Sequence, residues 1–219
     1  MIRVTPADEP KGFQTSVREP GLRALAEMVG EVPRFPRKKG KAFAKRAARR
    51  EEIPAEKMPP YWTEALDNLM QAYNRICAYA CFRIHPVTGS RSVDHMAPKS
   101  RQWDRAYEWS NYRLACSMMN ARKQDFGDVL DPFEVQDGWF QLELVGFQAL
   151  PAPDLDPATR TQVEDTISRL GLNGREFRDA RERDVTNYEN DGRFDVLMEE
   201  SPFVARELRR QGRLREGDG

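Results

Sequence analysis

The sequence predicts an α+β fold in which a small strand-strand-helix unit lies between a basic N-terminal arm and a mostly helical C-terminal region. Three observations predict it. Apolar residues recur at helical spacing in residues 61–75, two β-like segments follow at 76–84 and 91–96, and helical patterns dominate after residue 156. We therefore divide the chain into an N-terminal extension (1–60), a central domain (61–133) and a C-terminal region (134–219).

The composition is typical of a water-soluble protein. The 219 residues suffice for a sizeable core, and no apolar run approaches the ~20 residues of a membrane span, so we expect no membrane partner. The first residues, Met-Ile-Arg-Val-Thr-Pro, lack the apolar stretch of a secretory signal. Three cysteines are too few for a disulfide framework. We therefore expect a cytoplasmic location and reduced thiols.

The formal net charge of zero hides an asymmetry between the two halves of the chain. Residues 1–123 hold 23 Lys and Arg against 13 Asp and Glu, a net charge of +10, and residues 124–219 carry −10. A basic half suits a protein that binds a polyanion, because phosphate neutralisation dominates nucleic-acid affinity. The acidic half would then repel DNA or cover the basic half. The alternative is that both halves are ordinary solvated surface.

The N-terminal extension contains a predicted helix at residues 21–28 and then a basic arm. Residues 34–50 hold nine basic residues and no acidic one. Such a run is typical either of a mobile, solvated segment or of a segment that contacts phosphate groups. The residues that we expect to contact phosphate are Lys38, Lys39, Lys45 and Arg46.

The central domain begins with a helix and continues as a ββα unit. Trp62, Leu66, Leu69 and Tyr73 form one apolar stripe, which predicts a helix over residues 61–75. After it we expect a strand (76–84), a turn (85–90) and a second strand (91–96), which pair as a hairpin. A returning loop and a helix (114–123) follow.

The C-terminal region begins with a strand pattern and continues as helices. Residues 138–147 alternate between apolar and polar positions, which predicts a strand. Asp156 and Pro157 form a typical helix start, and Gly171 is a typical helix end. Three further helices are expected at residues 174–188, 195–199 and 202–211.

Four polar residues within one short window of the central domain can together support phosphodiester hydrolysis. They are Asp94, His95, Asn111 and Asn120. The reaction needs a deprotonated water and positive charge near the phosphate. Mg²⁺ prefers oxygen ligands, which Asp94 and Asn120 offer, and histidine is the natural base near neutral pH. Because neighbouring side chains on a regular strand point to opposite faces, we expect a twist or bulge to bring Asp94 and His95 together.

At these residues the sequence resembles the HNH endonucleases, whose fold is a ββα-metal motif. The Asp94-His95 pair, Asn111 in Trp-Ser-Asn-Tyr-Arg-Leu and Asn120 in Asn-Ala-Arg-Lys match the family pattern in order, within residues 61–133. The resemblance implies that His95 is the general base and that Asp94 and Asn120 bind Mg²⁺ or Mn²⁺. It also implies that Asn111 fixes the loop and orients the imidazole.

The cysteines depart from the pattern of this family. Many HNH domains hold a structural zinc ion with two Cys-x-x-Cys pairs. Cys77 and Cys116 match the first position of each pair, but Ala80 and Met119 occupy the second positions, and Cys81 is one residue out of register. A four-thiolate site is therefore not available. Cys81 could complete at most a three-sulfur site, so we expect no structural zinc and expect Cys77, Cys116 and Met119 to pack in the core.

Basic residues that follow the motif are candidates for contacts with the nucleic-acid backbone. They are Lys99, Arg101, Arg122 and Lys123. For the first two, surface solubility is the alternative role. For Arg122 and Lys123 the alternative is a favourable interaction with the carboxyl end of the predicted helix.

The resemblance implies a metal-dependent endonuclease that hydrolyses DNA and leaves 5′-phosphate and 3′-hydroxyl ends. The segments Tyr-Glu-Trp-Ser-Asn-Tyr, Val-Leu-Asp-Pro-Phe and Leu-Gly-Leu-Asn look like a bacterial HNH group found in anti-phage defence systems of the Septu, retron and Zorya types. The alternative is a catalytically silent or autoinhibited module on the same scaffold. Its acidic helical tail would dock on a partner protein such as a defence ATPase.

Overall fold

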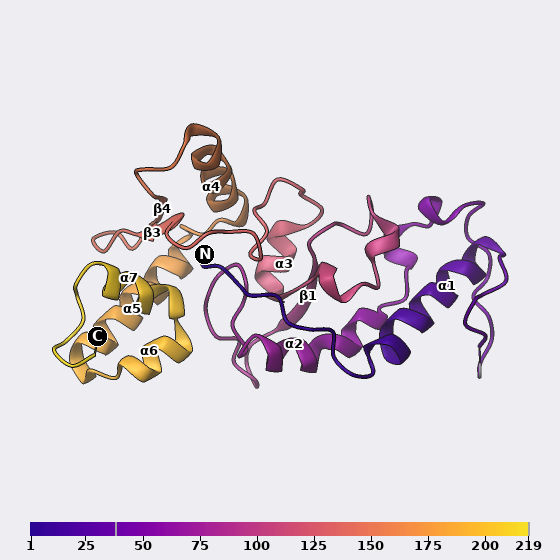
Figure 1. Cartoon of the computed structure of the whole chain (residues 1–219), viewed down its shortest axis with the longest axis horizontal. Coiled ribbons are helices and arrows are strands. Elements are labelled where there is room, and N and C mark those ends of the chain that lie inside the picture. The colour runs from indigo at the N-terminus through magenta and orange to yellow at the C-terminus, as the bar shows by residue number, and fades with distance from the viewer. Residues whose placement is uncertain (38, 219) are drawn as a thin grey trace.

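The computed structural model describes residues 1–37 and 39–218 and has a mixed α+β architecture, which confirms the predicted class (Figure 1). Within these residues there are seven α-helices and two small antiparallel sheets of two strands each. Helix α1 lies at one end of the elongated molecule, helices α5 to α7 lie at the other, and β1 and α3 lie between them (Figure 1). No helix in the described part of the chain is long and apolar enough to cross a bilayer.

The regular elements follow the chain in a simple order. They are α1 (Glu19–Val29), α2 (Leu66–Ala72), β1 (Arg91–His95), β2 (Tyr112–Cys116), α3 (Ser117–Lys123), β3 (Phe140–Leu142), β4 (Ala149–Pro151), α4 (Pro157–Leu170), α5 (Arg175–Asp191), α6 (Phe194–Glu200) and α7 (Pro202–Arg210). Short 3₁₀ turns and one π-helical segment (Gln14–Arg18) supplement them.

Helix α1 contains the segment predicted at residues 21–28 and ends at Gly30, whose φ of 82° suits glycine. The basic arm after it has no helix or strand before residue 50 in its described part, but it is attached to α1. The Arg46 N–H donates to the carbonyl of Met28 (2.6 Å), and the Arg37 guanidinium pairs with Glu27 (2.7 Å). The arm therefore follows the surface of α1 as an ordered segment.

The strand pairing in the central domain differs from the prediction. Strand β1 pairs with β2, so that Asp94 lies opposite Arg113 and His95 opposite Tyr112. The predicted strand at residues 76–84 is wrong. It forms a tight turn closed by a single bridge, with Cys81 at a φ of 57°.

This turn docks on the hairpin. The Ala78 N–H donates to the carbonyl of Leu114 in β2 (2.8 Å), and the Tyr79 side chain is fully buried. The apolar character of the segment therefore reflects burial of a turn, which periodicity cannot distinguish from a short buried strand. The predicted helix at 114–123 starts at Ser117, because the three residues before it belong to β2. The order strand-strand-helix is nevertheless present as β1, β2 and α3.

In the C-terminal region the single strand predicted at 138–147 is wrong in extent, because these residues form only β3 and the turn of a hairpin whose second strand is β4. Strand β3 ends at Leu142, and the chain returns as β4 because the Glu143 carboxylate accepts from the backbone N–H of Gly146 (2.7 Å) and closes the turn. Helix α4 confirms both of its predicted ends. The Asp156 carboxylate accepts from two N–H groups of the first turn at 3.0 Å, and Gly171 ends the helix at a φ of 59°.

The C-terminal region packs on the central domain. The N–H of Leu130 donates to the Thr166 hydroxyl of α4 (3.0 Å), and one continuous buried cluster includes apolar residues from all three segments of the chain. Helix α4 contacts α3, which carries Asn120. The position of α3 therefore depends on helices that follow it in the sequence.

Candidate functional site

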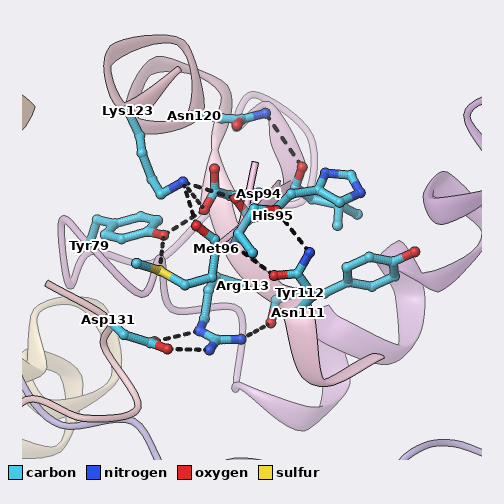
Figure 2. Close-up of polar contacts among 12 residues, drawn as sticks. Tyr79, Asp94, His95, Met96, Asn111, Tyr112, Arg113, Asn120, Lys123 and Asp131 are labelled. Carbon is cyan, nitrogen blue, oxygen red and sulfur yellow. Dashed lines mark hydrogen bonds and ion pairs between the residues drawn. The ribbon is translucent and has the colours of Figure 1, made fainter. Parts of the chain in front are cut away.

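A cavity of about 610 Å³ lies along β1 and beside α3, which contributes Asn120 to its lining. Three of the four predicted site residues, Asp94, His95 and Asn120, line this cavity, together with Lys99 and Trp62. Figure 2 shows the Asp94 carboxylate turned towards Lys123 and the His95 ring turned away from it. Of the twist or bulge predicted here, the bulge is wrong, because β1 and β2 pair in unbroken register through His95, and the twist stays a prediction. Both Asp94 and His95 nevertheless line the cavity.

Asp94 is held by one of its two oxygens. Its Oδ2 accepts from the Tyr79 hydroxyl (2.5 Å) and lies 3.2 Å from the Lys123 ammonium, and all three side chains are buried (Figure 2). Burial raises the pKa of Asp94, and Lys123 and Tyr79 partly offset this by stabilising the charged form. No group in the described part of the chain donates to Oδ1. The carboxylate therefore keeps one free oxygen.

Asn120 is held in a similar way by its nitrogen. The Nδ2 group donates to the Ser92 hydroxyl (2.6 Å) and lies 3.5 Å from the Val93 carbonyl, which only accepts. These contacts set the orientation of the amide and leave its Oδ1 as the available atom. Two oxygens, one from β1 and one from α3, thus remain free at the same cavity.

The free oxygens suit a hard cation. Carboxylate and amide oxygens are ligands that Mg²⁺ and Mn²⁺ accept, so the donor set fits the predicted ion. Among residues 1–37 and 39–218, no three His, Cys, Asp or Glu side chains gather closely enough to hold a metal by themselves. An ion bound by Asp94 and Asn120 would need its other ligands from water or substrate.

The His95 imidazole is fixed with one nitrogen protonated. Its Nε2 lies 2.9 Å from the Ala106 carbonyl, which can only accept, so Nε2 carries the proton. The ring packs edge-on against Trp62 and Tyr112, at centroid distances of 4.9 and 5.2 Å. Burial lowers the pKa of His95 to about 4. At neutral pH the ring is uncharged, and Nδ1 is free to accept a proton.

We expect this burial to appear in the pH dependence of stability. Because the pKa of His95 is about 4 in the folded protein and 6.5 when exposed, the unfolded chain binds an extra proton between these values. Stability should therefore fall by about 2 kcal/mol from pH 7 to pH 5 through this residue. Urea unfolding at both pH values would measure it. A His95→Gln variant should lose this dependence, a His85→Asn variant should keep it, and equal slopes in all three proteins would contradict the prediction.

Asn111 closes the loop between β1 and β2. Its Oδ1 accepts from the Ala97 N–H (2.7 Å), and its Nδ2 donates to the carbonyls of Ala97 and Arg105 (both 3.0 Å). The side chain is fully buried. The same loop carries Ala106, whose carbonyl holds the imidazole. Asn111 can therefore act on His95 only through the loop.

Lys123 does not fit the predicted role in contacting DNA. Its side chain is fully buried, and Nζ donates to the His95 carbonyl (2.9 Å) in addition to its pairing with Asp94. A lysine at the end of a short helix usually extends into solvent, but here the last turn of α3 faces the hairpin. The prediction for this residue is wrong.

Arg122 is also engaged inside the protein. Its guanidinium donates to the carbonyls of Leu170 and Gly171 at the end of α4 (3.1 and 3.2 Å) and pairs with Glu176 (2.5 Å). The alternative role predicted for Arg122 was an interaction with the carboxyl end of its own helix, α3. The guanidinium instead interacts with the carboxyl end of α4. This geometry contradicts a free phosphate contact.

The remaining predicted cations are accessible to different degrees. Lys99 lines the cavity with its ammonium 5.2 Å from the Trp62 ring centre, and burial lowers its pKa. Arg101 is exposed beside it, and Lys39, Lys45 and Arg46 are exposed on the arm. Lys38 lies outside the described residues.

The cysteines lie where the resemblance places a zinc site. The Cys116 N–H donates to the sulfur of Cys77 (3.4 Å), and Ala80 and Met119 are both buried in the core. Cys81 is buried as well. The packing in the core predicted for Cys77 and Met119 is confirmed, whereas Cys116 is only half-buried. The lack of a structural zinc ion stays a prediction.

Two residues that position the candidate metal ligands, Tyr79 and Ser92, were not predicted from the sequence. Tyr79 falls in the segment predicted as a strand. Its hydroxyl reaches Asp94, which lies 15 residues later in the chain, and no local signal in the sequence indicates such a contact. Ser92 has a usable signal, because it lies two residues before Asp94 and therefore on the same face of β1.

No family model matches this chain, and no curated protein matches its sequence significantly.

Proposed function

We propose that this protein is a divalent-metal-dependent endonuclease of the HNH type that hydrolyses DNA phosphodiester bonds. One observation carries the proposal. Three residues line the same cavity: His95, whose Nδ1 is free to accept a proton, and Asp94 and Asn120, which each keep one hard oxygen free of hydrogen bonds. The net charge of +10 on residues 1–123 supports a polyanionic substrate.

In this proposal each residue has a distinct role. His95 takes a proton from the attacking water at Nδ1, while the hydrogen bond from Nε2 to Ala106 keeps the ring in place. Asp94 and Asn120 would hold Mg²⁺ or Mn²⁺ through their free oxygens. When bound, the ion supplies positive charge against the phosphate oxygens as negative charge builds up. Lys99 adds a further positive charge at the cavity. The P–O3′ bond breaks as the water oxygen bonds to phosphorus, so the water oxygen becomes part of the 5′-phosphate and the 3′-oxygen leaves as a hydroxyl with a proton from solvent.

We further propose, on the resemblance stated above, that the nuclease works in the cytoplasm in anti-phage defence beside a partner protein such as an ATPase. Residues 124–219, which include helices α4–α7, support a protein contact better than a DNA contact, because they carry a net charge of −10, of which −8 lies in residues 124–156. These helices are joined to the site through Arg122 and Glu176.

A second candidate is the catalytically silent or autoinhibited module on the same scaffold. One observation favours it. Asp94 is only 1% exposed and already faces the Lys123 ammonium, so its charge is compensated before any metal arrives. In this candidate the site holds its shape, and the acidic C-terminal region docks on the partner protein.

Incubation of the full-length protein with supercoiled plasmid and Mg²⁺ or Mn²⁺ tests the first candidate. We expect nicked or linear DNA, no product with EDTA, and products that a DNA ligase can rejoin, because the ends carry 5′-phosphate. The full chain is needed, since α4 packs on α3 and its removal would expose the core. DNA binding without cleavage in either metal would favour the silent or autoinhibited module.

Neutralising the basic arm should weaken DNA binding and reduce its salt dependence. Each cation removed from a phosphate reduces the steepness of log K against log salt by about 0.9, so changing Lys39, Lys45 and Arg46 to Ala should reduce it by up to about 3. Fluorescence anisotropy at several salt concentrations would measure the slope. The matched control changes three exposed arginines of the acidic half, Arg175, Arg183 and Arg193. Equal slopes in the arm variant and the parent would reject a role for these residues.

A further inference from the structure

The charges around the cavity nearly cancel. Three acidic residues line it, Glu56, Asp94 and Asp125, and two basic ones, Arg91 and Lys99. A third cation, the Lys123 ammonium, lies behind Asp94 at 3.2 Å. A divalent ion that enters alone therefore meets a site with no net negative charge, although hard ions bind mainly through such charge.

Lys123 cannot leave when an ion arrives. Its side chain is fully buried, and the ammonium is fixed by the carbonyls of His95 (2.9 Å) and Met96 (3.5 Å) as well as by Asp94. A lysine at the surface would turn into solvent, but this one has no such route. Its positive charge therefore stays close to any ion bound by Asp94.

The contacts of Asp94 place the two positive charges on opposite oxygens. Lys123 and Tyr79 both engage Oδ2, so an ion must take Oδ1 of the same carboxylate. Like charges on the two oxygens of one buried carboxylate repel each other strongly, because the surroundings screen them weakly. The negative charge of a phosphodiester next to the ion would offset this repulsion.

We infer that the divalent ion and the phosphodiester bind this site cooperatively, because the fixed ammonium of Lys123 opposes the ion until the phosphate is present. This inference rests on the proposed function and adds a form of regulation to it. The protein holds the ion weakly without DNA, so the complete catalytic site forms only on substrate. By linkage, the ion must tighten DNA binding by the same factor.

Metal affinity measured without any cleavage tests the inference. A His95→Ala protein keeps the DNA intact, and Mn²⁺ binding is followed by electron paramagnetic resonance with and without a short DNA duplex. We expect Mn²⁺ to bind at least tenfold more tightly with the duplex. The reverse titration, DNA binding with and without Mn²⁺, should show the same factor.

A Lys123→Gln change in the His95→Ala protein should strengthen Mn²⁺ binding without DNA at least tenfold and reduce the cooperativity. The glutamine amide keeps a donor for the carbonyl of residue 95 but does not carry the positive charge. Lys57→Gln, an exposed lysine beside the cavity-lining Glu56, is the matched control and should change neither value. If the Lys123 variant does not fold, the Mn²⁺ affinity of the His95→Ala protein measured with and without the duplex still tests the cooperativity.

The outcomes separate the inference from the proposed function. Equal Mn²⁺ affinity with and without DNA, with both ligands binding, would overturn the inference and leave the nuclease proposal intact. Failure to bind Mn²⁺ under either condition would overturn both.

Discussion

Replacing His95 with alanine is expected to reduce plasmid cleavage by at least about a hundredfold, because a positioned general base contributes about 10²- to 10⁴-fold to such reactions. The structure leaves Nδ1 as the free nitrogen of a neutral ring, since Nε2 is committed to the Ala106 carbonyl. Alanine removes the acceptor but none of the metal ligands or basic residues. DNA affinity and metal affinity should therefore remain close to those of the parent protein.

The control for this variant is the only other histidine of the chain. His85 lies in the exposed turn before β1, where its Nδ1 accepts from the N–H groups of Val87 and Thr88. A His85→Asn protein should cut at the parent rate. Circular dichroism and a DNA-binding measurement would show whether each variant is folded. If folded His95→Ala protein cuts as fast as the parent, His95 is not the base and the proposed function fails.

Replacing Arg113 with alanine should lower the free energy of unfolding by about 3–5 kcal/mol, because it breaks a buried ion pair and leaves one charge without its partner. The Arg113 guanidinium pairs with both oxygens of Asp131 (2.7 and 2.5 Å). It also lies 3.4 Å from the centre of the Phe133 ring and donates to the carbonyl of Ser110 (2.8 Å). Since Arg113 lies opposite Asp94 in the hairpin, the change should also loosen the site.

The chain offers a closely matched exposed pair as the control. Arg169 pairs with Asp128 (2.6 Å) and lies 4.0 Å from the centre of the Phe126 ring, but the charged side chains are 39% and 47% exposed. Water competes for such a pair, so Arg169→Ala should cost no more than about 1 kcal/mol. Urea unfolding of both variants at pH 7 would compare them. Similar destabilisation of the two variants would show that burial does not set the strength of the Arg113 pair.

The elements that can be predicted from the sequence are those with local causes. Helix α4 has a capping aspartate, a proline in its first turn and a glycine at its end, and the structure uses all three. Strand β1 is also predictable, with its two site residues at the carboxyl end. Each of these features depends on residues only a few positions apart.

Strand pairing cannot be predicted in the same way. Strand β2 is buried along almost its whole length and shows no polar and apolar alternation, so its pattern resembles a loop followed by a helix. The segment predicted to pair with β1, residues 76–84, instead forms a turn that docks on β2. Pairing depends on contacts between residues far apart in the chain, which a local pattern does not contain.

The sequence by itself determined which chemistry is available at the candidate site: an acid, an imidazole and an amide, in an order that resembles a nuclease motif. Only the tertiary structure decided which atoms of these groups are free, because Tyr79, Ser92 and the Ala106 carbonyl each occupy one of them. It also decided that Lys123 faces inward, since the burial of a helix face depends on what packs against it and not on the helix alone.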